Sequence, residues 1–448
     1  TKEGNYALTL SGASKTNTGP LTINAGNVTI NGASLNTNIT VNSGATLIAG
    51  TNYVICHGGG ILTINGGTFK AGNAATYIDG GLVLNNATIT NTAGSGTYIS
   101  SRGLWTANGN NTINMNISTE TNNTNGSNFN IQSGTTTINN SIYNYAGWYQ
   151  GLTKNGTGTL VLNGANSYNG TTNLRAGTLV LNNNTALGAG SLSTLTIISG
   201  TLDVTNGSTI TLTNNYTQSW NGDFAFLGTN GSLNIGTGAV TMNASRTVTV
   251  SNGTLTVGGA IGGSTFGLTK NGSGTLVLSG ANTYNGTTTV NNGTLTLGAA
   301  DRIADTSNLN VAGGTFNLGG FNETLGSITG SGNITLGAGT LTTNSTSNTT
   351  FSGLISGTGG LTKNGTSTLT LSGNNTYNGT TTINAGTIEI AAAGRLGAGN
   401  YTGNISNSGT LIHSGTSNQT LSGILSGTGS LTQNGASTLT LSGANTYN

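Results

Sequence analysis

The chain has 448 residues, of which 77 are glycine and one is proline, and charged residues make up only 4%, against roughly 25% in ordinary soluble domains. So few charges exclude a conventional charged surface, and a formal net charge of +2 without a basic cluster excludes a face for nucleic acid. Apolar residues reach 33% and occur in regular short runs, which excludes a disordered linker. These properties predict one ordered, repetitive body.

Strand-like runs begin near the N-terminus and recur along the whole chain. In each run apolar residues alternate with threonine, and glycine-containing pairs such as Asn-Gly or Ser-Gly end the run. Alternation with a period of two predicts short, half-buried β-strands separated by tight turns. Asparagine recurs beside these glycines, which predicts amide ladders between turns. No long segment has the apolar spacing of a helix. The clearest runs are Leu8–Leu10, Leu21–Ile23, Val28–Ile30, Ile39–Val41, Leu62–Ile64, Ile210–Leu212 and Leu255–Val257.

Residues 1–150 follow this pattern but contain no copy of the tyrosine-containing block that recurs later. Their least regular stretch runs from Trp105 to Gln150. We expect residues 1–150 to form an irregular N-terminal part of a β-solenoid with longer loops, and a separate domain is the alternative. The irregular stretch ends in an aromatic cluster, Tyr143, Tyr145, Trp148 and Tyr149.

Residues 151–448 contain a recurring block that starts with Gly-Leu-Thr-Lys-Asn-Gly and leads to a Tyr-Asn turn, with the last copy incomplete. The interval between successive tyrosines shortens by a constant step, and the three intervals are close to five, four and three multiples of about 23 residues. This spacing predicts a coil with turns of about 23 residues, whereas a propeller blade needs roughly 40. We expect the aromatic ring of each repeat tyrosine to pack at a turn of the coil, and the alternative is that these rings form a platform for sugars. The tyrosines are Tyr168, Tyr284, Tyr377 and Tyr447.

Aligned copies of the block also predict which residues form the core. The middle residue of each strand varies between valine, threonine and glutamate, as in Val180, Thr296 and Glu389, so it must face solvent. The flanking leucines and isoleucines should then point into the coil. These are Leu160, Leu162, Leu179, Leu181, Leu276, Leu278, Leu295, Leu297, Leu369, Leu371, Ile388, Ile390, Leu439 and Leu441.

The recurring blocks resemble the autotransporter-associated β-strand repeat. The resemblance covers roughly Gly151 to Asn448 and includes Leu152–Gly156, Asp301–Asp305, Gly314–Gly320 and Phe351–Gly359 in the family's order. It implies an all-β fold, a right-handed parallel β-helix, in a secreted or surface-displayed region of a long bacterial protein. Such regions serve as stalks, adhesive surfaces or scaffolds.

Candidate catalytic and metal-binding residues are sparse. Asp301 and Asp305 flank Arg302, and a loop salt bridge is favoured over a catalytic pair because their spacing does not align the carboxylates on a strand face. His57 and His413 lie far apart in sequence, and Cys56 is the only cysteine, so no metal or cofactor site is predicted. A small buried thiol is expected at Cys56.

The expected function is that of a non-enzymatic extracellular or cell-surface stalk or scaffold with an adhesive role. The alternatives are a filament subunit assembled by head-to-tail stacking of solenoid ends and a carbohydrate-active β-helix enzyme. Expected partners are other copies of the chain, end to end or lateral, and host or surface glycans, without nucleic acid. The chain opens without a signal peptide and lacks an apolar stretch long enough to cross a bilayer, so no membrane-spanning segment is predicted.

Overall fold

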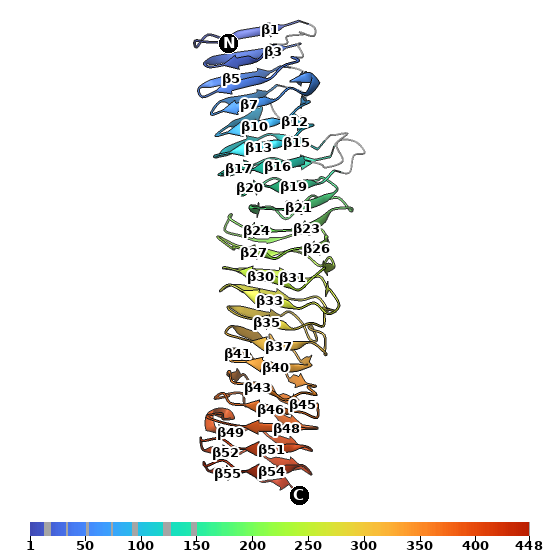
Figure 1. Ribbon diagram of the computed structural model, residues 1–448, viewed down its shortest axis with the longest axis vertical. Helices are drawn as coiled ribbons and strands as arrows, with labels where there is room; N and C mark the ends of the chain where they lie inside the picture. The colour runs from blue at the N-terminus through green and yellow to red at the C-terminus, as the bar shows by residue number, and fades with distance from the viewer. Residues whose placement is uncertain are drawn as a thin grey trace. The chain divides into compact units, whose positions relative to one another are not determined.

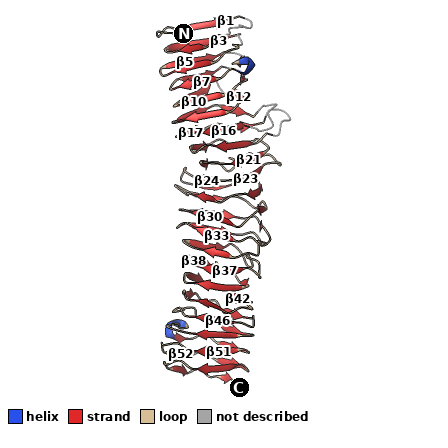
Figure 2. Ribbon diagram, viewed as in Figure 1, coloured by secondary structure: helices blue, strands red, loops and turns tan. Residues whose placement is uncertain are grey.

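The chain folds into short parallel β-strands. The computed structural model describes residues 1–12, 19–32, 35–50, 53–72, 75–91, 97–119, 127–144 and 150–447. In these ranges the strands have two to six residues, and two one-turn 3-10 helices occur, η1 (His57–Gly59) and η2 (Gly397–Gly399) (Figures 1 and 2). The chain divides into two compact units, unit 1 (Thr1–Gly236) and unit 2 (Thr237–Asn448). The predicted all-β class is confirmed.

Unit 1 is a coil in which each turn places up to three strands, on what we call the first, second and third faces. Each strand pairs in parallel with the strand on the same face one turn later, as β7 does with β10, β8 with β11 and β9 with β12. These two turns comprise β7 (Leu62–Asn65), β8 (Thr68–Ala71), β9 (Thr76–Ile78), β10 (Leu82–Asn85), β11 (Thr88–Asn91) and β12 (Tyr98–Ser101). The other second-face strands are β1 (Leu8–Ser11), β3 (Gly26–Asn31), β5 (Ala45–Ala49), β14 (Asn111–Asn114), β17 (Thr135–Ile138), β20 (Thr159–Leu162), β22 (Thr178–Leu181), β24 (Gly200–Asp203) and β27 (Phe224–Phe226).

Unit 2 has the same three-faced turn. Two consecutive turns comprise β39 (Glu323–Leu325), β40 (Ser327–Gly330), β41 (Asn333–Thr335), β42 (Leu341–Thr343), β43 (Thr349–Phe351) and β44 (Ile355–Ser356), and the strands of each face pair in parallel. The remaining second-face strands are β30 (Arg246–Val250), β33 (Leu268–Asn271), β35 (Thr288–Val290), β37 (Asn308–Val311), β46 (Thr368–Leu371), β48 (Thr387–Ile390), β51 (Thr410–His413) and β54 (Ser430–Gln433). Both units are therefore parallel β-solenoids.

The interior of each coil is apolar because alternate residues of every strand point inward. Strands such as β20, β34 (Thr275–Leu278) and β46 show buried residues at every second position. Most of the leucines and isoleucines that the aligned repeats predict to point inward are buried, while in the last turn Leu439 is half-buried and Leu441 is exposed. The buried ones are Leu160, Leu162, Leu179, Leu181, Leu276, Leu278, Leu295, Leu297, Leu369, Leu371, Ile388 and Ile390.

One of the middle positions expected to face solvent is buried. Thr296 and Glu389 are half-buried, but Val180 is only 2% exposed. Val180 pairs with Val161 of the preceding turn and with Asp203 of the following one. In β22 the last three side chains are all buried. Variation at an aligned position therefore did not establish exposure in every copy.

The turns vary in length, and the repeats do not all start on the same face. Leu21 pairs with Ile39, whereas Ile113 pairs with Ile138, so the second of these turns is several residues longer than the first. In unit 2 one copy of the repeat starts with β33 on the second face, whereas the next starts with β45 (Leu361–Lys363) on the first face. The interval between these two copies is consequently not a whole number of turns.

Glycine columns line corners of the coil where successive backbones approach closely. A Cβ atom on Gly379 would lie 2.2 Å from the carbonyl oxygen of Gly359, and one on Gly403 would lie 2.3 Å from that of Gly379. These distances are too short for any side chain. The abundance of glycine thus follows in part from contact between turns.

Asparagine side chains stack outside the strands, as the sequence predicts. In unit 1 each Nδ2 group donates to the Oδ1 atom of the asparagine one turn earlier, from Asn42 to Asn24 at 2.6 Å and from Asn65 to Asn42 at 3.2 Å. The ladder continues from Asn85 to Asn65 at 2.7 Å and from Asn108 to Asn85 at 3.0 Å. Because each amide both donates and accepts, the ladder satisfies polar groups without charge.

The strand ladder continues past the predicted division at residue 150. On the first face, β16 (Ser127–Ile131) pairs with β19 (Leu152–Asn155). The separation of residues 1–150 from 151–448 stays a prediction based on sequence regularity. Within the aromatic cluster only Tyr143 lies in the described part of the chain. The centroid of its ring lies 5.7 Å from that of the Tyr98 ring, edge to face. Tyr145, Trp148 and Tyr149 lie outside it.

Candidate functional site: buried lysine clamps and a polar hollow

The lysine of the recurring Lys-Asn-Gly turn is buried inside the coil. Lys154 is 0% exposed, and its Nζ atom donates to the carbonyl oxygens of Asn155 at 2.9 Å, Gly156 at 2.8 Å and Ala176 of the next turn at 3.0 Å. Burial lowers the pKa of Lys154 to about 8 because an apolar interior disfavours the charged amine. We call this arrangement a lysine clamp, since one amine joins two turns.

Unit 2 repeats the lysine clamp. Lys270 donates to the carbonyl oxygens of Asn271 at 2.8 Å, Gly272 at 2.8 Å and Asn292 at 3.2 Å, and burial lowers its pKa to about 8. Lys363 donates to Gly365, and burial lowers its pKa as well. Both side chains are fully buried. The amines of Lys154 and Lys270 thus each join two turns, whereas the hydrogen bond of Lys363 lies within its own turn.

Two further turns carry variants of the clamp. Lys2 donates to the carbonyl oxygens of Glu3 at 2.9 Å, Gly4 at 2.6 Å and Ala25 at 3.3 Å. Gln433 replaces the lysine in the last repeat, and its Nε2 atom donates to Gly435 at 3.2 Å and Ser437 at 2.7 Å.

Sequence reasoning missed the clamps, although a signal was present. In Leu152-Thr153-Lys154 the lysine has the same parity as the inward-pointing Leu152, so alternation alone places its side chain inside. The motif Lys-x-Gly at Lys2 and Gly4 likewise marks a clamp at the start of the chain.

The repeat tyrosines are buried where the chain turns. Tyr168, Tyr284 and Tyr377 are fully buried, and each hydroxyl group shares a hydrogen bond with a threonine four residues later, at 2.5, 2.9 and 2.9 Å. Burial raises the pKa of each phenol. These three rings cannot form a platform for sugars, because a ligand cannot reach them. Tyr447, in β56 (Thr446–Tyr447), is half-buried.

Arg302 does not form the loop salt bridge expected with Asp301 or Asp305. Its guanidinium group donates from Nε to the carbonyl oxygen of Ala300 at 2.7 Å and from Nη1 to that of Ser279 at 3.0 Å. The side chain of Arg302 is thus bound to backbone carbonyls of its own turn and the preceding turn, and the expected ion pair is absent.

The structure brings a third carboxyl group, Glu323, to this region. It is buried and accepts hydrogen bonds from the backbone N–H groups of Arg302 at 2.9 Å and Ile303 at 2.8 Å. The pKa of Glu323 is raised to about 7, chiefly by burial; the two backbone hydrogen bonds oppose this rise, and the nearby carboxylates of Asp301 and Asp305 add to it. Sequence separation concealed this residue, since it lies one turn later than Arg302.

A polar hollow of about 480 Å³ opens in unit 2, and Asp305 is one of the residues that line it. Hydroxyl, amide and carboxyl groups from three successive turns line it, among them Asp305, Thr306, Asn308, Asn344, Thr346 and Ser347. The lining contains no aromatic ring and no basic side chain. Such a surface can exchange hydrogen bonds with a polar, uncharged molecule.

The remaining titratable residues do not gather into a metal site within the described ranges, which contain no group of three or more His, Cys, Asp or Glu side chains suited to an ion. His413 is buried, and its Nδ1 atom lies 2.6 Å from Oε1 of Gln433. Cys56 is buried, and burial raises the pKa of its thiol to about 12. In the described part of the chain, no helix has the length and hydropathy to cross a membrane.

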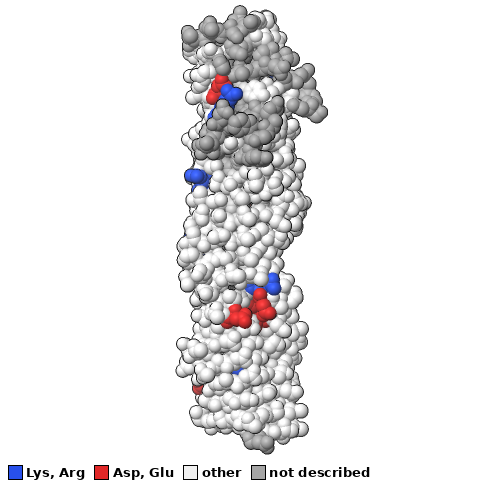
Figure 3. Space-filling model, turned by 90° about the vertical axis from the view of Figure 1, so that its right-hand side faces the viewer, with Lys and Arg blue, Asp and Glu red and all other residues white. Residues whose placement is uncertain are grey.

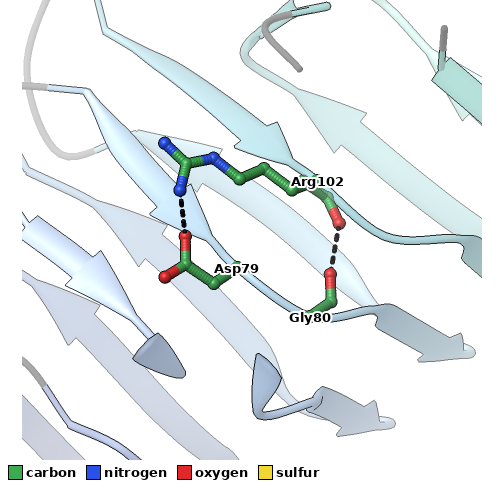
Figure 4. A network of polar contacts seen from close by, with 4 residues as sticks. Asp79, Gly80 and Arg102 are labelled. Atoms are coloured by element: carbon green, nitrogen blue, oxygen red, sulfur yellow. Dashed lines mark hydrogen bonds and ion pairs between the residues drawn. The ribbon is translucent and has the colours of Figure 1, made fainter. Parts of the chain in front are cut away.

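Exposed charged side chains are few, and those visible in Figure 3 lie in small groups. Figure 3 shows that most of the visible face is uncharged. In unit 1, Arg102 and Asp79 form an ion pair with 2.8 Å between Nη1 and Oδ1 (Figure 4). Beside it, Ser101 donates to the carbonyl oxygen of Gly80 at 3.2 Å. An exposed pair of this kind contributes little to stability, on the order of 1 kcal/mol or less.

Comparison with known proteins identifies the repeats. The family described as passenger-associated-transport-repeat matches residues 1–36, 152–181, 268–297, 361–390 and 431–448. These five segments contain Lys2, Lys154, Lys270, Lys363 and Gln433. Each match to the family therefore carries a lysine or glutamine that donates to the glycine-containing turn after it, including the N-terminal match that sequence analysis did not recognise as a repeat.

One similar protein is the adhesin BmaC autotransporter of Brucella suis biovar 1 (strain 1330). It is 40% identical over 168 residues, which make up 35% of this chain and 5% of that protein. The chain thus spans a small part of the length of this curated relative. No solved structure matches the chain.

Proposed function

We propose, from the premise that this chain is an autotransporter passenger-like repeat protein, that its β-solenoid is a non-enzymatic, adhesive stalk or scaffold. The repeat family and the relative place the protein among secreted proteins displayed at the cell surface. Adhesion, the partners and the lack of catalysis are parts of the proposal.

The observation that carries the proposal is how each turn is divided between inside and outside. Leucine, isoleucine and valine fill the interior, while threonine, serine and asparagine dominate the exterior at the same strand positions turn after turn. Backbone groups pair with the neighbouring turns throughout each unit, as in β46, β48 and β51. This construction supports a stiff, uncharged surface that presents many similar polar contacts.

The relative's name supports an adhesive role, because the 168 matched residues belong to a protein called an adhesin. Adhesive contact through a repetitive surface gains from multivalency, since many weak contacts act together. We expect glycans or further copies of the chain as partners on these grounds.

The acidic residues near Arg302 support the absence of catalysis. Glycoside hydrolysis commonly requires two carboxyl groups that both face the substrate, about 5 to 9.5 Å apart. Glu323 is buried and its carboxylate is held by two backbone N–H groups, so it faces the protein and not an open cleft.

Display of this chain on a non-adherent bacterium tests the proposal. We expect more cells to attach to an epithelial layer than cells that carry the display anchor alone, and we expect no release of reducing sugar from polysaccharides. Attachment equal to that of the anchor-only cells would contradict the adhesive role. Polysaccharide cleavage by the purified chain would contradict the non-enzymatic one.

A further inference from the structure

The polar hollow of unit 2 lies at the corner between the first and second faces. Its lining comes from three successive corners: residues 305, 306 and 308 at the start of β37, residues 326 and 327 at the start of β40, and residues 344–347 and 349 at the start of β43. A side chain at Gly326 would not fit, since its Cβ atom would lie 2.8 Å from the carbonyl oxygen of Thr306. Glycine at this position therefore lets the backbones of successive turns approach closely at the hollow.

The backbone around the hollow is held by its own hydrogen bonds. Gly326 N donates to Ser307 O at 2.8 Å, and the Ser345 hydroxyl donates to Ser347 O at 2.6 Å. From the next turn, the Ser367 hydroxyl donates to Ser345 O at 2.7 Å. A site whose frame is already paired loses little conformational entropy when a ligand enters.

The side chains at the rim remain available to a ligand. Asp305, Thr306, Asn344, Thr346 and Ser347 are exposed. Together they offer hydroxyl and amide groups that both donate and accept, and one carboxylate that only accepts. A ligand with many hydroxyl groups matches this set, because each hydroxyl can donate to one group and accept from another.

The charge of the hollow selects against anions. Asp305 lies on its rim, and the carboxylate of Asp305 is close enough to Glu323 to raise the pKa of that buried group. No basic side chain lines the hollow to offset this charge. Its volume of about 480 Å³ lies within the range of roughly 300–1,000 Å³ that small-ligand sites occupy.

We infer that this hollow binds a neutral saccharide unit of a surface glycan, with Asp305 accepting hydrogen bonds from sugar hydroxyl groups and Asn344 and Ser347 completing the contacts. The inference rests on the proposed adhesive function and identifies its ligand and its location.

Direct binding of the purified full chain to immobilised neutral hexose and N-acetylhexosamine oligosaccharides tests the inference. Asp305→Asn removes the charged acceptor and should weaken binding roughly tenfold, the equivalent of one charge-assisted hydrogen bond. Ser347→Trp should fill the hollow and abolish binding. Asp223→Asn and Ser406→Trp, which alter exposed residues outside the hollow, are matched controls and should bind as the unaltered chain does.

Each outcome of these binding measurements either supports or overturns the inference. Binding of a neutral oligosaccharide that Ser347→Trp abolishes and Ser406→Trp preserves supports the inference. No binding of neutral sugars, stronger binding of sialylated sugars or of a lysine-rich peptide, or binding unaffected by Ser347→Trp overturns it. Thermal unfolding checks that the variants fold. If Ser347→Trp does not fold, Thr346→Trp serves as a second variant that blocks the hollow.

The attachment assay separates this inference from the proposed function. If displayed Ser347→Trp protein still mediates attachment, the saccharide site is wrong and adhesion stands. If the unaltered chain mediates no attachment, the adhesive proposal itself fails, whatever the purified chain binds.

Discussion

Lys154, Lys270 and Lys363 place an amine where the coil otherwise keeps leucine and isoleucine. The burial of a charged group is unfavourable unless its hydrogen-bonding partners are close, and here backbone carbonyl oxygens of glycine-containing turns provide them. Each clamp therefore makes the local structure depend on a single side chain.

Replacing Lys270 with methionine should destabilise unit 2 by about 1–3 kcal/mol, because three part-buried carbonyl oxygens lose their donor while the side-chain volume stays similar. Denaturant unfolding measures the difference. Lys70→Met is the control, since Lys70 lies on the outward side of β8 and is half-buried. Equal stability of Lys270→Met and the unaltered chain would show that the clamp is dispensable.

Glu323 makes the stability of unit 2 depend on pH. Its pKa is about 7 in the folded chain and about 4.5 in the unfolded chain, so between these values the folded chain keeps a proton that the unfolded chain releases. The free energy of unfolding should fall as the pH rises from 4.5 to 7, and Glu323→Gln should reduce this fall. Unfolding at pH 5 and pH 7.5 measures it, with Asp223→Asn as the control. An identical pH dependence in Glu323→Gln would contradict the assignment.

At the scale of elements, the strands were predictable and the corners were not. The alternation in Leu276-Val277-Leu278 is local, and it is sufficient to predict a strand and its buried face. The burial of Val180, the carbonyl partners of Arg302 and the bond from Lys154 to Ala176 depend on neighbouring turns, and each differed from the expectation or was missed.

The glycine columns are the second determinant at this scale. Gly379→Ala should destabilise unit 2 by at least about 2 kcal/mol, because the new Cβ atom would lie 2.2 Å from a backbone oxygen that cannot move without shifting the adjacent turn. Gly262→Ala is the matched control, since its nearest heavy atom would lie 3.5 Å away. Thermal unfolding compares them, and similar melting temperatures would refute close contact as the reason for glycine.

At the scale of the whole molecule, each turn pairs with the turns next to it in sequence. Pairing of this kind makes stability local, so damage to one turn should spread to its neighbours and fade beyond them. The chain also divides into two compact units, unit 1 and unit 2.

Hydrogen exchange can test this locality. In Gly379→Ala, amide protection should fall in β45, β46, β47 (Thr381–Ile383) and β48, while β7 and β10 of unit 1 should keep the protection they have in the unaltered chain. A uniform loss of protection across both units would instead indicate that the whole chain unfolds as one cooperative body.

The sequence by itself determined the β-solenoid class, the resemblance to surface-displayed repeats and the inward side of most strands, because period-two alternation and glycine turns act within a few residues. Only the tertiary structure decided the length of each turn, the face on which a repeat begins, the electrostatic influence of Asp305 on Glu323 and the hollow that Asp305 lines. The physical reason is that these features depend on which residues stack across turns of unequal length, and small differences in corner length set that register.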